Sequence, residues 1–132
     1  MKKVMIFGTF DLLHPGHNFV ISEASKLAST NGKLHIVVAR DTNVEKIKHQ
    51  KPKQNENGRL EILKNKYPSA HIQLGDPEDF LAPVREVNPD LILLGYDQKL
   101  PSDIKEEDLG CDIERLPAFE PEKWKSSIRR DS

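Results

Sequence analysis

Ten consecutive residues, Gly8-Thr9-Phe10-Asp11-Leu12-Leu13-His14-Pro15-Gly16-His17, follow a short apolar run over residues 3–7. An apolar run closed by a glycine is typical of a strand that is buried on both faces. Residues 16–28 then carry apolar side chains at helical spacing, and Asn31-Gly32 suits the end of such a helix. The stretch therefore predicts a strand, a tight turn and a helix start in direct succession.

The same alternation of strand-like and helix-like segments continues along the chain. Strands are expected at residues 34–39, 70–74, 91–94 and 113–116, and helices at residues 42–48, 58–66 and 77–87, with a polar loop over residues 50–57. Alternating strands and helices predict an α/β domain with a parallel sheet and right-handed crossovers. Ligands of such sheets bind beyond the carboxyl ends of the strands, where residues 8–11 and 95–97 are expected to lie.

Composition narrows the class of protein. The 132 residues suit one domain, and a net charge of -1 argues against electrostatic binding of nucleic acid. No apolar run approaches the roughly 20 residues that span a bilayer, so we expect no membrane partner. Cys111 is the only cysteine, which excludes an internal disulfide. We expect a cytoplasmic protein.

The two histidines of the quoted stretch are its most informative residues. His14 and His17 are three residues apart, so on one helical turn their imidazoles point to the same side. Gly16 lets a ligand approach the backbone closely, and the N–H groups and dipole of a helix start favour an anion. The pattern predicts a phosphate site with two imidazole donors. A zinc pair is disfavoured, because His35, His49 and His71 offer no matching spacing for further ligands.

This decapeptide resembles the HxGH motif of the cytidylyltransferase-like nucleotidyltransferases, and the resemblance continues through nearly the whole chain. It extends to the segments Val38-Ala39-Arg40-Asp41, Lys48 with Lys51-Pro52 and Arg59, Leu94-Gly95-Tyr96-Asp97-Gln98, and Ser126-Ser127. It implies a Rossmann-like single domain over residues 1–132, with five parallel strands in the order 3-2-1-4-5 flanked by helices. It also implies transfer of a nucleoside monophosphate from an NTP to a phosphorylated acceptor, with release of pyrophosphate.

The resemblance assigns roles to individual residues. His14, His17 and Lys48 would be catalytic, and Asp11 and Arg59 are candidates for binding the acceptor. The nucleotide would be bound by Gly8, Thr9, Phe10, Gly16, Asp97, Ser126 and Ser127. Mg²⁺, or another divalent cation, would accompany the NTP and use mostly substrate oxygens and water as ligands.

Several of these residues also have purely structural interpretations. Arg59 would equally pair with Glu56 or Glu61, and Asp97 would cap the turn after its strand. Ser126-Ser127 would serve as a helix N-cap, and Trp124 beside this pair would pack rather than cover a ligand ring.

Three details resemble the archaeal-type FAD synthases, which transfer AMP from ATP to FMN: Val38-Ala39-Arg40-Asp41, the spacing from Lys48 to Arg59, and Leu94-Gly95 followed by Asp97-Gln98. Leu116-Pro117-Ala118-Phe119 lacks the arginine that glycerol-phosphate cytidylyltransferases carry before their serine/threonine pair, which disfavours CTP. Two alternatives stay open: a CTP-dependent cytidylyltransferase for glycerol 3-phosphate or another polyol or amino-alcohol phosphate, and a catalytically silent nucleotide-binding module. Relatives are often homodimers, and we expect the same here.

Overall fold

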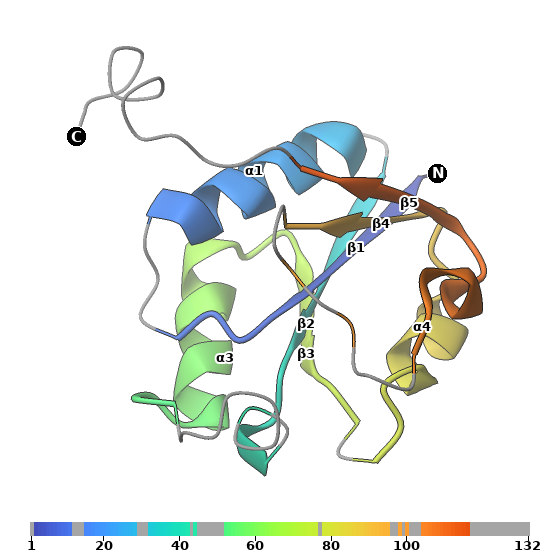
Figure 1. The fold of residues 1–132 in the computed structure, drawn as a ribbon. Coiled ribbons are helices and arrows are strands. Elements are labelled where there is room, and N and C mark those ends of the chain that lie inside the picture. The colour runs from blue at the N-terminus through green and yellow to red at the C-terminus, as the bar shows by residue number, and fades with distance from the viewer. Residues whose placement is uncertain are drawn as a thin grey trace.

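The computed structural model describes residues 2–11, 15–28, 32–42, 44, 52–76, 78–95, 98, 100 and 104–116. The elements in chain order are β1 (Lys3–Gly8), α1 (Pro15–Ala28), β2 (Lys33–Val38), α3 (Glu56–Lys66), β3 (His71–Leu74), α4 (Ala82–Val87), β4 (Leu91–Leu94), the 3₁₀-helix η1 (Glu106–Leu109) and β5 (Asp112–Arg115) (Figure 1). All four strand pairings are parallel, and the sheet order is β3-β2-β1-β4-β5. The predicted α/β fold and strand order are therefore confirmed.

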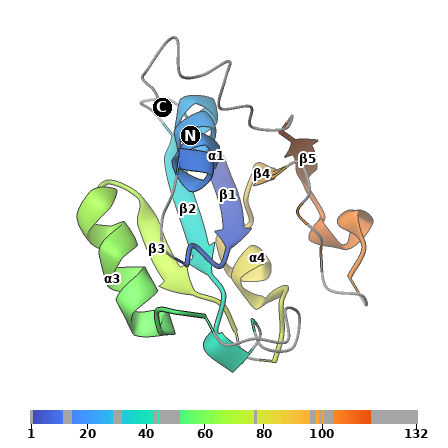
Figure 2. The same ribbon diagram turned by 60° about the vertical axis from the view of Figure 1, so that its left-hand side comes forward.

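Side chains that alternate along the strands build two apolar layers, one on each face of the sheet. Val4 and Ile6 of β1 pack with Ile21 of α1 and Leu63 of α3 on one face. The next residues of β1, Met5 and Phe7, pack on the other face with Val84 of α4 and Leu109 of η1. Figure 2 shows α3 and α4 on opposite sides of the sheet. Because β1 is central and covered on both faces, its apolar run lacks the polar alternation of a half-exposed strand.

The first crossover is closed by a glycine at the predicted position. A Cβ atom on Gly32 would lie 2.0 Å from the carbonyl oxygen of Ala28 and 2.4 Å from that of Lys2. Only a residue without a side chain permits this close approach between the start of β1 and the end of α1.

Two helices begin elsewhere than predicted. α3 begins at Glu56 rather than at residue 58, because the side chain of Asn55 accepts a 2.7 Å hydrogen bond from the Gly58 N–H and caps the helix inside the expected loop. α4 begins only at Ala82, so Pro83 lies in its first turn, where its missing N–H costs no helical hydrogen bond. Of the helix expected over residues 42–48, the structure describes Thr42 and Val44, both helical.

The loop before α4 has its own hydrogen bonds, which compete with the helix expected from residue 77. Asp76 Oδ1 accepts from the N–H groups of Glu78 and Asp79, both at 2.8 Å. These backbone donors, more than the charges of Arg40 and Arg85, hold the pKa of Asp76 below its ordinary value. Carboxylate capping of this kind stabilises a turn, which explains the late start of α4.

Within the described residues, no helix is long and apolar enough to cross a membrane.

A pair of histidines lies side by side on β2 and β3. His35 is the register partner of His71, and their ring centroids are 5.1 Å apart. Burial, with the nearby His71, Lys33 and Lys3, lowers the pKa of His35 from 6.5 to about 4. The folded protein therefore keeps this imidazole neutral at pH values where the unfolded chain binds a proton.

We expect the free energy of unfolding to decrease as the pH falls from about 6.5 through about 4, because protons bind His35 more tightly in the unfolded state. His35→Gln should flatten this part of the pH profile, since glutamine does not titrate. His71→Gln should flatten it only in part, because burial of His35 remains. Urea melts at intervals across this pH range measure the slope; a profile unchanged by His35→Gln would contradict the account.

Candidate functional site at the carboxyl edge of the sheet

The sheet topology brings the described part of the predicted site together at the carboxyl edge of β1. Gly8 ends β1, residues 9–11 form the turn after it, and Gly16 and His17 lie in the first turn of α1. We call residues 8–11 the β1–α1 turn. Five predicted site residues, His14, Lys48, Asp97, Ser126 and Ser127, lie outside the described residues, as does Trp124.

The β1–α1 turn contains a backbone conformation that is rare for a bulky residue. Phe10 has a φ of 54°, in the left-handed region. Such a conformation costs roughly 1–3 kcal/mol and persists only where the surrounding structure enforces it. Enforced strain of this kind concentrates at functional sites, so the turn is a good candidate for one.

The ring of Phe10 occupies the space between Gly8 and His17. It is 4% exposed, and a Cβ atom on Gly8 would lie 2.8 Å from its Cε2 and Cζ atoms. The ring meets the imidazole of His17 edge-on, with centroids 5.6 Å apart and an interplanar angle of 64°. Gly8 is therefore required to make room for Phe10, and Phe10 in turn forms a wall beside His17.

α1 begins with Pro15 in its first position, where the missing N–H costs no helical hydrogen bond. His17 is half-buried on the first turn of the helix. The helix dipole and the N–H groups of a helix start favour negative charge there. Imidazole and helix start together suit the phosphates of a nucleotide.

Asp11 is held by the segment that leads into α3. Its Oδ2 atom accepts a 2.8 Å hydrogen bond from the Lys53 N–H, and its Oδ1 atom accepts a 2.9 Å bond from the Gln54 N–H. This carboxylate therefore joins the β1–α1 turn to the start of α3, a structural role that the sequence did not suggest.

Arg59 is the one buried charged residue in the described chain, with an exposed fraction of 0%. Its ion-pair partner is Asp41, at 2.7 Å, and neither Glu56 nor Glu61. Glu56 instead pairs with Arg40, at 3.1 Å, and its other carboxylate oxygen accepts from the Asp41 N–H. In this arrangement a ligand has no access to the Arg59 guanidinium, which argues against the predicted binding of the acceptor by Arg59.

Two further side chains brace the same edge: Gln98, which belongs to a recognised motif but had no predicted role, and Arg115, which the sequence analysis did not single out. Gln98 accepts from the Gly95 N–H and donates to the carbonyl oxygen of Phe7, both at 2.9 Å, so it ties β4 to β1. Arg115, at the end of β5, donates to the carbonyl oxygens of Gly95 and Gln98 at 2.9 and 2.7 Å. The position of Gln98 just after a buried strand was a signal for such a role. Its bonding partners could not be predicted, because they depend on which strands are neighbours in the sheet.

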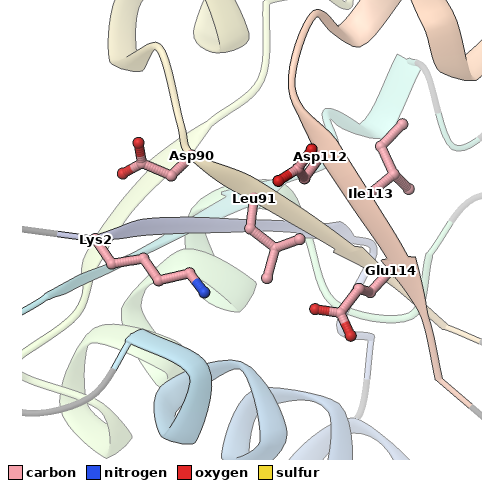
Figure 3. A pocket seen from close by; sticks show the side chains of 6 residues that line it. All are labelled: Lys2, Asp90, Leu91, Asp112, Ile113 and Glu114. Atoms are coloured by element: carbon pink, nitrogen blue, oxygen red, sulfur yellow. The ribbon is translucent and has the colours of Figure 1, made fainter.

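A pocket of about 680 Å³ lies at the opposite, amino edge of the sheet, away from this site (Figure 3). It is lined by Lys2, Asp90, Leu91, Asp112, Ile113 and Glu114. Three carboxylates against one lysine would repel a triphosphate. The pocket is therefore unsuited to the phosphates of the predicted nucleotide site.

Comparison with known proteins identifies the family of the chain. The sequence matches the cytidylyltransferase-like family over residues 5–128. An FAD synthase from Methanobrevibacter smithii is 43% identical over 135 aligned residues, covering 98% of this chain and 88% of that protein. An FAD synthase from Methanolacinia petrolearia is 36% identical, covering 96% of this chain and 86% of the relative.

A solved structure has the same fold. A protein from Thermoplasma volcanium, described as a lipopolysaccharide core biosynthesis protein, superposes with a TM-score of 0.77 at 33% identity, covering 91% of this chain and 99% of that one. The strained β1–α1 turn, the helix start with His17 and the 3-2-1-4-5 sheet thus occur in a sequence that the family model matches almost from end to end. The chain belongs to the cytidylyltransferase-like family and is a nucleotidyltransferase.

Proposed function

We propose that this protein is an FMN adenylyltransferase, which joins ATP and FMN to give FAD and pyrophosphate. The observation that carries the proposal is the match to FAD synthases over almost the full chain, at 43% and 36% identity in the two relatives described above. The geometry at this edge supports it, because the imidazole of His17 and the start of α1 lie beside the β1–α1 turn, and both favour a bound phosphate.

In this reaction the protein mainly has to position the two substrates. An oxygen of the FMN phosphate forms a new bond to the α-phosphorus of ATP, while the bond from that phosphorus to the bridging oxygen breaks. Pyrophosphate leaves with the electron pair. The attacking oxygen already carries negative charge near neutral pH, so no residue has to remove a proton from it. Catalysis then depends on alignment and on stabilising the charge that builds on the phosphates.

The site residues would divide this task. His17, and His14 three residues before it, would donate hydrogen bonds to the α-phosphate and the leaving group. Thr9 and the backbone at Gly16 would contact the same phosphates, and Lys48 would neutralise the phosphate charge. The nucleotide-binding role of Gly8 and Phe10 is indirect in this proposal, because together they set the position of His17.

The remaining predicted contacts complete the nucleotide site. Asp97 would bind the nucleoside end, and Ser126 and Ser127 would bind the pyrophosphate end. We retain cytoplasmic location and a homodimeric state as parts of the proposal.

A divalent cation such as Mg²⁺ suits the donors at this edge. Among the described residues no group of three or more histidine, cysteine, aspartate or glutamate side chains is arranged to hold a metal ion. Mg²⁺ keeps several water molecules and binds through substrate phosphates with one or two carboxylates. Asp11 is the carboxylate within the β1–α1 turn that would serve. Bound Mg²⁺ would supply charge neutralisation for the triphosphate.

Pyrophosphate release with defined substrate pairs tests this function. ATP and CTP are each combined with FMN, glycerol 3-phosphate or ethanolamine phosphate in the presence of Mg²⁺. We expect release with ATP and FMN, accompanied by FAD in equal amount.

The other outcomes separate the alternatives. Pyrophosphate release with CTP and a small phosphate would support the same mechanism, but it would show that the acceptor is not FMN and that the nucleotide is not ATP. Binding of NTP without release from any pair would identify a catalytically silent nucleotide-binding module.

His17→Ala tests the role of the imidazole. We expect kcat to fall by roughly 10²–10⁴-fold, the usual loss when a preorganised charge-stabilising donor is removed, while the protein remains folded. His71→Ala is the matched control, since His71 is an exposed histidine at the amino end of β3, and it should retain wild-type kcat. A fall of less than about tenfold in folded His17→Ala would remove His17 from the mechanism.

A further inference from the structure

The buried guanidinium of Arg59 joins three segments that are distant in the sequence. Its Nη1 atom donates to the carbonyl oxygen of Thr9 at 2.7 Å, and its Nε atom donates to the carbonyl oxygen of Gln54 at 3.0 Å. Its Nη2 atom donates to Asp41 Oδ1 at 2.7 Å. One side chain of α3 therefore holds the β1–α1 turn, the segment after β2 and the segment that enters α3.

Packing of the core alone does not explain why an arginine occupies position 59. Desolvation of a buried ion pair costs about as much as the pair gains, and apolar residues of similar volume often give equal stability. What an apolar residue would lack is the fixed fork of donors, which sets the directions of its acceptors. The value of Arg59 therefore lies in the geometry that it imposes.

That geometry acts directly on the strained residue of the turn. The peptide group between Thr9 and Phe10 contains the carbonyl that Arg59 holds, and the φ angle of Phe10 describes rotation relative to that group. Holding the carbonyl stabilises the left-handed conformation of Phe10, which would otherwise relax. The orientation of the Phe10 ring, and with it the wall beside His17, follows from this peptide.

A second attachment closes the brace. The Gln54 N–H donates to Asp11 Oδ1, while the Gln54 carbonyl accepts from Arg59. Gln54 is therefore linked to the β1–α1 turn in two ways. Its N–H bonds directly to Asp11, and its carbonyl oxygen shares the Arg59 guanidinium with the carbonyl oxygen of Thr9.

We propose that Arg59 is a positioning residue that sets the orientation of His17 through the Thr9–Phe10 peptide and the Phe10 ring. It does so without contacting a substrate. The proposal rests on the proposed function, in which His17 stabilises charge on the phosphates.

Arg59→Lys tests it, because lysine keeps the positive charge near Asp41 but has one nitrogen in place of the fork. We expect kcat to fall on the order of 10- to 100-fold, the loss that a small displacement of a catalytic group produces. The KM values for nucleotide and acceptor should stay unchanged, since no ligand contact is removed. Arg85→Lys is the matched control: Arg85 pairs with Asp79, its side chain is 62% exposed, and its replacement should leave kcat unchanged.

A spectroscopic measurement tests the same link without turnover. The Phe10 ring lies edge-on to His17, so the ring current of Phe10 shifts the imidazole proton resonances of His17. We expect these resonances to move in folded Arg59→Lys and to remain in place in Arg85→Lys.

If Arg59→Lys shows no cooperative unfolding transition, the double variant Arg59→Met/Asp41→Leu takes its place. It removes the buried charge of Arg59 together with that of its partly exposed partner Asp41, so that neither ion is left unpaired. A folded double variant should show the same loss of kcat with unchanged KM.

Two results would overturn the proposal. Wild-type kcat in either folded variant would show that His17 needs no brace, and a raised acceptor KM with normal kcat would indicate direct binding by Arg59. A wild-type enzyme that turns over a pair other than ATP and FMN would instead refute the acceptor assignment, and the variants would be compared on that pair.

Discussion

The hydrogen bond from the Arg59 guanidinium to the carbonyl oxygen of Thr9, 2.7 Å long, holds the turn on which the rest of the site depends. Phe10 keeps a left-handed backbone there that a bulky residue adopts only under constraint. α1 carries His17 in its first turn, and Gly8 leaves the space that the Phe10 ring fills beside this histidine. The proposed catalytic geometry is therefore fixed from α3, which packs beside the sheet and reaches the turn through the buried Arg59 side chain.

The sheet order explains how one edge gathers so many polar side chains. β1 is central, with β2 on one side and β4 on the other, so the segments after these three strands meet at one edge. Arg59, Asp41 and Glu56 connect the first two segments with α3, and Gln98 connects β4 with β1. Since phosphoryl chemistry demands alignment more than covalent work from the protein, a rigid edge of this kind suits a nucleotidyltransferase.

The sequence predicted the elements wherever apolar periodicity was strong, as in the buried run of β1 and the apolar spacing of α1. It predicted helix starts less well where a side chain caps the backbone. The cap at Asn55 lets α3 begin earlier than expected, and the hydrogen bonds to Asp76 hold a turn where α4 was expected to begin. The turn residues Gly8 to Asp11 were placed correctly at the carboxyl edge. The partner of Arg59 was predicted wrongly, since nearby glutamates in sequence are not its neighbours in space, and the Asp41 pairing requires the β2–α3 arrangement. The hydrogen bonds of Gln98 were not predicted for the same reason.

The most direct test of the central claim is to locate bound nucleotide by NMR, by adding ATP with Mg²⁺ to ¹⁵N-labelled protein and following the backbone amide resonances. If the β1–α1 turn and the start of α1 hold the phosphates, the largest shifts should fall on Thr9, Phe10, Gly16 and His17. Shifts concentrated on Asp90, Asp112 and Glu114, around the pocket at the amino edge, would contradict the account.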